Sequence, residues 1–250
     1  DKHWSRGLGD VYKRQTGYSA AHRELEQVLA EALNRDAVLL FSSGFAANQA
    51  LCQALFAEQG DIIADKYMHA SFIEGATASA ARLRRFAHND YTHLSALLSK
   101  TTSSHRLIAS EGVFSMDGDS PDVAQLVASA EASDSWLMLD DAHAFGVTGE
   151  YGLGSIDACQ LSQQQCPVVM GTFGKAVGTA GAFIAGSHAL IDYLVNYARH
   201  YIYSTAFPPA QAVATLHALS LVTQGAEREQ LHANIAPVSY THLTLPTTSF

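Results

Sequence analysis

The sequence predicts an α/β fold in three layers, α/β/α, with helices covering both faces of a mostly parallel sheet. Short apolar runs alternate along the chain with amphipathic stretches of helical period. Hydrophobic residues make up 48% of the 250 residues and charged residues 16%, which is ordinary for a soluble globular protein with a sizeable core. The length suits one large domain, or one domain and part of another.

The strand predictions come from short apolar runs that are bounded by polar or turn-forming residues. Such runs are typical of strands buried on both faces, as in a parallel sheet. The predicted strands are Ala37–Phe41, Asp61–Ala64, Arg82–Phe86, Arg106–Ser110, Trp136–Asp140, Val168–Thr172 and Ala182–Ala185.

The helix predictions come from apolar residues spaced three and four apart and from capping residues. Ser19 is placed to cap a helix over Ala20–Leu33. Ser120 is expected to cap a helix that has Pro121 in its first position and ends near Ser133. The other predicted helices are Gly44–Phe56, Ser71–Ala80, Thr92–Ser99, His188–Arg199 and Pro209–Val222.

Charge and composition exclude several classes of protein. The formal net charge is −9 without basic clusters, which argues against nucleic acid as the main partner. No apolar stretch is long enough to span a bilayer, so we expect no membrane partner. The three cysteines, Cys52, Cys159 and Cys166, are unevenly spaced and form neither a disulfide framework nor a zinc motif. Free thiols fit a reducing cytoplasm.

The two ends of the chain are related at the level of coding DNA. Residues 5–15 can be coded by an element whose reverse complement, in a shifted frame, codes for residues 238–242. Both strings resemble translated sequencing-library adapters; two ordinary polar tails are the alternative. We therefore expect residues 1–15 and 238–250 to be artefactual flanks and residues 16–237 to be a gene fragment.

Ligands of open α/β sheets bind at the carboxyl ends of the strands, so the residues that follow each strand matter most. Ser42, Ser43, Gly44 and Phe45 follow the first strand and open a helix. A helix start with a glycine lets free backbone amides approach a phosphate. A plain strand–turn–helix connection would have the same appearance.

Asp140 ends another strand, and His143 follows three residues later. This pair could bind a metal, orient a base, contact a ring nitrogen of a cofactor or form a capped turn. A metal would need further ligands of fixed type, and no other cluster of histidine and aspartate stands out. We expect no metal.

Lys175 lies between the strand Val168–Thr172 and the glycine-rich stretch at residues 178–181. Most lysines are solvated surface charges. Here partial burial would lower the pKa and yield a neutral amine that can attack a carbonyl. A reactive lysine, an acid for a pyridinium nitrogen and a phosphate-binding helix start are the parts that pyridoxal 5′-phosphate (PLP) requires.

Long runs of this sequence resemble the α-oxoamine synthases, which are fold-type I enzymes that depend on PLP. The resemblance covers nearly all of residues 16–237 and implies the PLP-binding large domain of a fold-type I transferase, incomplete, with a small C-terminal domain missing. The matching runs are Gly17–Ser19, Ser43–Gln49, His69–Ser71, Arg84–Asp90, Glu111–Asp119, Asp140–His143 and Thr172–Lys175.

The resemblance implies a role for each matching residue around the ring of PLP. Lys175 would form the Schiff base and remove the α-proton of the amino acid. Asp140 would pair with the pyridine nitrogen, and His143 would hydrogen-bond the ring hydroxyl with Ser115 beside it. His69 would stack on the ring face, although a core histidine with satisfied hydrogen bonds is the alternative.

The resemblance also implies how the phosphate is held. Gly44 and Phe45 would offer backbone amides, and Thr172 its hydroxyl. Ser204 and Thr205 match a segment that reaches the phosphate of the neighbouring subunit, so a homodimer is expected.

Within the family, the runs Thr172–Lys175 and Arg199–Pro209 most resemble the branch that condenses L-alanine with a pimeloyl thioester, on coenzyme A or a carrier protein, with decarboxylation. Branches that acylate glycine remain open. The fragment alone is expected to be inactive. Two rivals are a metal-dependent hydrolase that uses Asp140 and His143, and a non-catalytic binding subunit.

Overall fold

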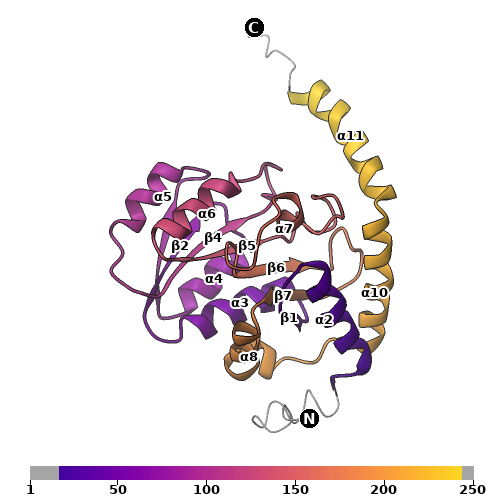
Figure 1. The fold of residues 1–250 in the computed structure, drawn as a ribbon, viewed down its shortest axis with the longest axis horizontal. Helices are drawn as coiled ribbons and strands as arrows, with labels where there is room; N and C mark the ends of the chain where they lie inside the picture. The colour runs from indigo at the N-terminus through magenta and orange to yellow at the C-terminus, as the bar shows by residue number, and fades with distance from the viewer. Residues whose placement is uncertain (1–16, 244–250) are drawn as a thin grey trace.

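The computed structural model describes residues 17–243, and their side chains as far as residue 235. It confirms the three-layer α/β/α fold (Figure 1). Apolar runs form most of the strands because their side chains are buried on both faces of the sheet; the edge strand at residues 81–86 is the exception, with only Phe86 buried. The strands are β1 (Ala37–Phe41), β2 (Gly60–Asp65), β3 (Ala81–Phe86), β4 (Arg106–Glu111), β5 (Trp136–Asp140), β6 (Val168–Thr172) and β7 (Ala182–Gly186).

The strand order is β1-β7-β6-β5-β4-β2-β3. The strand β7 runs antiparallel to both β1 and β6, and the other neighbours are parallel. The prediction of a mostly parallel sheet is therefore confirmed. Because β7 reverses direction, β1 and β6 run the same way, and the carboxyl ends of β1, β6, β5 and β4 share one edge.

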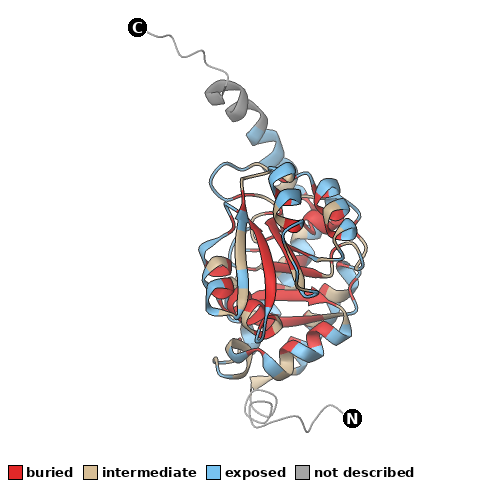
Figure 2. Ribbon diagram, turned by 90° about the vertical axis from the view of Figure 1, so that its left-hand side faces the viewer, coloured by how far each residue is buried: buried red, intermediate tan, exposed pale blue. Residues whose placement is uncertain are grey.

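Helices cover the two faces of the sheet and close a separate hydrophobic core on each. Figure 2 shows the buried sheet between exposed outer helix surfaces. One core lies between the sheet and α2 (Ala20–Ala32), α5 (Tyr91–Leu98), α6 (Val123–Ala132), α7 (Ser155–Ala158) and α10 (Pro209–Gln224). The other lies under α3 (Gly44–Leu55), α4 (Ala70–Ala78), α8 (His188–Tyr197) and α9 (Arg199–Ile202).

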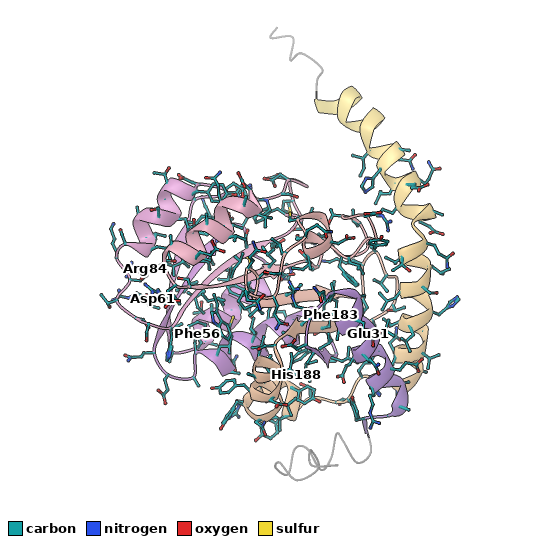
Figure 3. All side chains as sticks on the ribbon, viewed as in Figure 1. Glu31, Phe56, Asp61, Arg84, Phe183 and His188 are labelled. Carbon is teal, nitrogen blue, oxygen red and sulfur yellow. The ribbon has the colours of Figure 1, made fainter. Side chains whose placement is uncertain are left out.

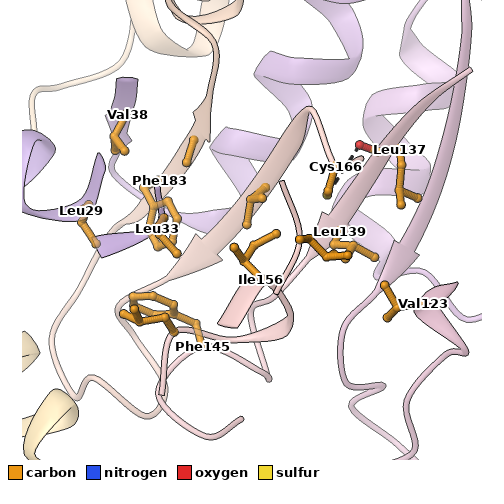
Figure 4. Close-up of a cluster of buried hydrophobic side chains, with 14 of the residues drawn as sticks. Leu29, Leu33, Val38, Val123, Leu137, Leu139, Phe145, Ile156, Cys166 and Phe183 are labelled. Carbon is orange, nitrogen blue, oxygen red and sulfur yellow. Dashed lines mark hydrogen bonds between the residues drawn. The ribbon is translucent and has the colours of Figure 1, made fainter. Parts of the chain in front are cut away.

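Aromatic rings fill the first core beneath the loops that carry the strand ends. Phe183 of β7 stacks on Phe173, with ring centroids 5.5 Å apart, and meets Phe145 edge-on at 5.0 Å. Figure 4 shows Phe183 and Phe145 with Leu29 of α2 and Ile156 of α7. Such interdigitated packing leaves these loops little freedom to move.

Two helix predictions need correction. The N-cap of α6 is Asp122, not Ser120, and its side chain accepts a hydrogen bond from the amide of Gln125. A carboxylate three residues before that amide satisfies the free donor directly, so the helix begins at Val123. The predicted helix His188–Arg199 is divided: α8 ends at Tyr197, and the extended Ala198 precedes α9.

The described residues end in a helix that was not predicted from the sequence. Gly225, with a φ of 84°, terminates α10, and α11 (Ala226–Leu243) follows. Figure 1 shows α11 extending away from the sheet, whereas α10 packs beside α2. The expected flank at residues 1–15 lies outside the described residues, and α11 continues across the expected boundary at residue 238. Within the described residues no helix is both long and apolar enough to cross a membrane.

Candidate active site

A cavity of about 190 Å³ opens at the shared carboxyl edge of β1, β6, β5 and β4. It brings together seven of the ten site residues predicted from the sequence. Those seven are Gly44, Phe45, His69, Asp140, His143, Thr172 and Lys175. Asn48, Ser71, Glu111, Ala142 and Met170 complete the lining.

Lys175 and His143 form the reactive pair of the cavity. Lys175 Nζ lies 2.6 Å from His143 Nε2. Desolvation lowers the pKa of Lys175, against the opposing charges of Asp140 and Glu111. Desolvation also lowers the pKa of His143, and Lys175 adds to this effect. Both groups are therefore biased toward their neutral forms, which can accept protons.

Asp140 lies at the base of the cavity and is 2% exposed. Its Oδ2 accepts a hydrogen bond from Asn48 Nδ2 at 2.9 Å, and its Oδ1 accepts one from the amide of Ala142 at 3.0 Å. Burial nevertheless raises the pKa of Asp140. The two hydrogen bonds orient the carboxylate, but no described cation pairs with it directly.

Glu111 ends β4 directly opposite Asp140 in the strand register. Burial, followed by the charge of Asp140, raises the pKa of Glu111 to about 8. Its Oε1 is buried without a hydrogen-bond partner. Two neighbouring buried carboxyl groups cannot both ionise cheaply, and Asp140 receives the donors that an anion needs. Glu111 is therefore the protonated member of the pair near neutral pH.

The start of α3 forms the opposite wall of the cavity. Ser43 is the N-cap, and its Oγ accepts a hydrogen bond from the amide of Ala46 at 3.1 Å. The backbone amides of Gly44 and Phe45 belong to the first turn of α3. Backbone N–H groups in the first turn of a helix have no partner within the helix. Thr172 lies on the same wall, and its hydroxyl donates to the carbonyl of Gly181 at 2.9 Å.

His69 is the N-cap of α4. Its Nδ1 lies 2.8 Å from Ser71 Oγ and accepts a hydrogen bond from the Ser71 amide at 3.2 Å. The ring is exposed at the cavity rather than packed in the core. This placement disfavours the alternative of a core histidine.

Asp141 holds the loop after β5 in place. Its two oxygens accept hydrogen bonds from the amide and hydroxyl of Ser155, both at 2.7 Å. A Cβ on Gly112 would lie 2.1 Å from both Asp141 Oδ1 and Ser155 Oγ. Glycine is therefore required at position 112 for the loop that carries His143 to close against β4.

Three predicted residues do not line this cavity. Ser115 is exposed on the loop between β4 and α6. Thr205 instead lines a small separate cavity with Tyr18 and His22, and Ser204 lines neither. The described residues contain no group of three or more His, Cys, Asp or Glu side chains placed to hold a metal, so the metal-dependent alternative gains no support there.

Sequence comparison places the chain in a family. Residues 13–244 match the family of aminotransferases of class I and II. The chain therefore belongs to the aminotransferase class I and II family.

The similar curated proteins agree with the predicted resemblance to α-oxoamine synthases. The chain is 46% identical over 235 residues to 8-amino-7-oxononanoate synthase of Saccharophagus degradans, covering 94% of the chain and 59% of the relative. It is 47% identical over 222 residues to the synthase of the same name from Nitrosococcus oceani, covering 88% of the chain and 59% of that protein. The chain thus spans about three fifths of these relatives.

Two solved structures are similar to the chain over most of its length. An 8-amino-7-oxononanoate synthase from Francisella tularensis superposes with a TM-score of 0.79 at 32% identity, covering 94% of the chain and 70% of that structure. A serine palmitoyltransferase from S. paucimobilis with a bound PLP–myriocin aldimine superposes with a TM-score of 0.82 at 28% identity, covering 90% and 62%. The predicted family and the predicted cofactor, PLP, are confirmed.

The cavity itself fits PLP. The buried Asp140 lacks a cation, which a protonated pyridine nitrogen would provide. Asn48 Oδ1 and Glu111 Oε1 are buried without partners, so the cavity base has polar atoms ready for a ligand. The amides at the start of α3 suit a phosphate.

Proposed function

We propose that the whole protein is a PLP-dependent acyltransferase that condenses L-alanine with a pimeloyl thioester to give 8-amino-7-oxononanoate, with release of the free thiol and loss of carbon dioxide. The observation that carries the proposal is the meeting of Lys175, His143 and Asp140 in one cavity at the strand ends. The identity to synthases of this name over most of the chain supports the choice of substrates.

Each residue has a proposed task in holding the cofactor. Lys175 would bind PLP covalently through Nζ. Asp140 would pair with the ring nitrogen and keep it protonated, and His143 would contact the ring hydroxyl. The amides of Gly44 and Phe45 would receive the phosphate.

When bound, PLP supplies an electron sink that stabilises negative charge at the α-carbon of the amino acid. Desolvation lowers the pKa of Lys175, which favours the neutral amine over its proportion in an exposed lysine, and a neutral Nζ can accept the α-proton. His143, 2.6 Å away, holds Nζ in place by hydrogen bonding. The buried carboxylate of Asp140 favours a positive charge beside it at the cavity base.

The proposal extends to assembly. Ser204 and Thr205 lie outside the cavity of their own chain, which supports the expectation that in a homodimer they reach the phosphate held by the neighbouring subunit. Thr172 would also have to turn its hydroxyl from the Gly181 carbonyl to donate to a phosphate. The three free thiols, two of them buried, support a cytoplasmic location.

The test joins residues 16–237 to the remaining parts of a full-length relative and adds PLP. We expect a visible absorbance band that borohydride abolishes and that Lys175→Ala lacks. Lys100→Ala, at an exposed position outside the cavity, is the matched control and should keep the band. An equal band in Lys175→Ala would contradict the assignment.

Substrates are tested with the same chimera. Alanine with pimeloyl-CoA should give the highest kcat/KM, and glycine or acetyl-CoA should give much lower values. A preference for glycine would redirect the proposal to the glycine-acylating members of the family. Activity that is lost to chelators and is indifferent to Lys175→Ala would support the metal-dependent hydrolase instead.

A further inference from the structure

A chain of hydrogen bonds, buried at Asp140 and Asn48 and part-buried at His69, connects Asp140 to His69 through two residues that have no assigned role. Asn48, in α3, is 0% exposed. Its Nδ2 lies 2.9 Å from Asp140 Oδ2 and 3.0 Å from Ser71 Oγ. A side-chain amide carries two N–H donors, so both hydrogens of Asn48 are committed.

The orientation of the Asn48 amide is fixed by its partner. An ionised carboxylate only accepts hydrogen bonds, so Asp140 Oδ2 requires Nδ2 and repels Oδ1. The same Nδ2 then donates to Ser71 Oγ. The charge on Asp140 thus determines which way the amide faces.

Ser71 connects the Asn48 amide to His69 by hydrogen bonds. Its hydroxyl has one hydrogen, and because Oγ accepts from Asn48, that hydrogen is directed to His69 Nδ1 at 2.8 Å. The backbone amide of Ser71 donates to the same Nδ1 at 3.2 Å. An imidazole nitrogen that accepts two hydrogen bonds carries no proton, so the proton of the neutral ring is on Nε2.

We propose that Asn48 and Ser71 are positioning residues that fix His69 as the Nε2–H tautomer and tie the orientation of its ring to Asp140. The importance of this arrangement for catalysis rests on the proposed function, in which Asp140 contacts PLP, and on the expected stacking of His69 on the PLP ring. The tautomer is a property of the chain alone. The Nε2–H donor has no partner among the described residues, and the cavity that His69 lines is open to it.

The three residues that orient His69 come from three different elements of the fold. Asn48 comes from α3, Ser71 from α4 and Asp140 from the end of β5. The packing of α3 against α4 is therefore what sets the hydrogen-bonding state of a residue at the cavity mouth. A residue that acted only by filling space would leave the tautomer unchanged.

The experiment is NMR of the full chain labelled with ¹⁵N in its histidine rings, with no PLP added. Long-range ¹H–¹⁵N couplings then distinguish the two tautomers. His69→Gln identifies the signal by its loss. We expect Nε2–H to dominate in the unaltered chain. Ser71→Ala should change the tautomer ratio roughly fivefold toward Nδ1–H, as the loss of one hydrogen bond implies, and Ser71→Thr should restore it.

Asn48→Leu removes both amide donors and should produce a change in the same direction. A predominant Nδ1–H tautomer in the unaltered chain overturns the proposal without any variant, even if Asn48→Leu fails to fold. An unchanged ratio in folded Ser71→Ala overturns it as well. Because no cofactor is present, the result is independent of whether Lys175 binds PLP.

Discussion

Glu111→Gln tests the assignment of the proton between the two carboxyl groups at the cavity base. Glu111 is 3% exposed, and burial together with Asp140 raises its pKa from 4.5 to about 8. In the unfolded chain this carboxyl loses its proton near pH 4.5, whereas in the folded chain it keeps it until about pH 8. Between those values the folded state binds the extra proton, so rising pH destabilises it.

The size of the effect follows from the width of this window. Each pH unit within it costs about 1.4 kcal/mol. Between about pH 5.5 and pH 7.5, Glu111 should lower the free energy of unfolding by roughly 3 kcal/mol. Glutamine has a similar shape and does not titrate, so Glu111→Gln should lack this loss and gain stability relative to the unaltered chain as pH rises.

Urea unfolding followed by circular dichroism across this pH range measures the difference. Asp140 and Asp141 also have raised pKa values, but both are present in the two proteins, so their effects largely cancel. Glu131→Gln, at an exposed position on α6, is the control and should follow the unaltered chain. A stability difference between Glu111→Gln and the unaltered chain that stays constant with pH would refute the reasoning.

Three further predictions concern the scaffold of the site. Gly112→Ala should lower the free energy of unfolding by about 1–3 kcal/mol, because its Cβ would collide with Asp141 and Ser155; an unchanged melting temperature would contradict the close approach. Ser43→Ala should cost about 1 kcal/mol by urea unfolding through loss of the α3 cap, and Ser43→Gly only a few tenths; equal losses would argue against a capping role. Of the three cysteines, only the exposed Cys159 should react with Ellman's reagent before unfolding, and rapid reaction of a second thiol would show that the cores are less closed than described.

Much of the sheet could be predicted from sequence because its local signals are strong. The bounds of β1, β5 and β6 match the predicted apolar runs, since polar or turn-forming residues end each run abruptly. The antiparallel orientation of β7 could not be predicted, because the apolar pattern of a short buried strand is the same whether it pairs parallel or antiparallel with its neighbours. The predicted start of α6 at Pro121 was wrong because both Pro121 and Asp122 are typical of helix starts. Only Asp122 accepts the capping hydrogen bond, from the amide of Gln125. Figure 3 shows how closely side chains fill the space between the layers, which a linear pattern does not reveal.

The site was predicted only where its residues follow a strand along the chain. Lys175, Asp140 and His143 could be selected because they stand directly after apolar runs. The predicted fourth strand ended at Ser110, one residue short, which left Glu111 outside the sheet and hid its pairing with Asp140. Asn48 and Ser71 were missed because their contacts depend on the packing of α3 on α4. The roles given to Ser115, Ser204 and Thr205 stay predictions.

The antiparallel strand β7 also sets a length scale for whatever the cavity holds. Adjacent strands lie about 4.8 Å apart, and β7 adds one such spacing between β1 and β6. The loop at residues 42–43 bridges this gap, because a Cβ on Gly44 at the start of α3 would lie 3.9 Å from Thr172 Cβ on β6, the strand next to β5. The distance between an anionic group held at the start of α3 and a ring atom held at Asp140 therefore depends on the path of this loop past β7. Deleting or shifting β7 would change which ligands fit without altering any residue that touches them.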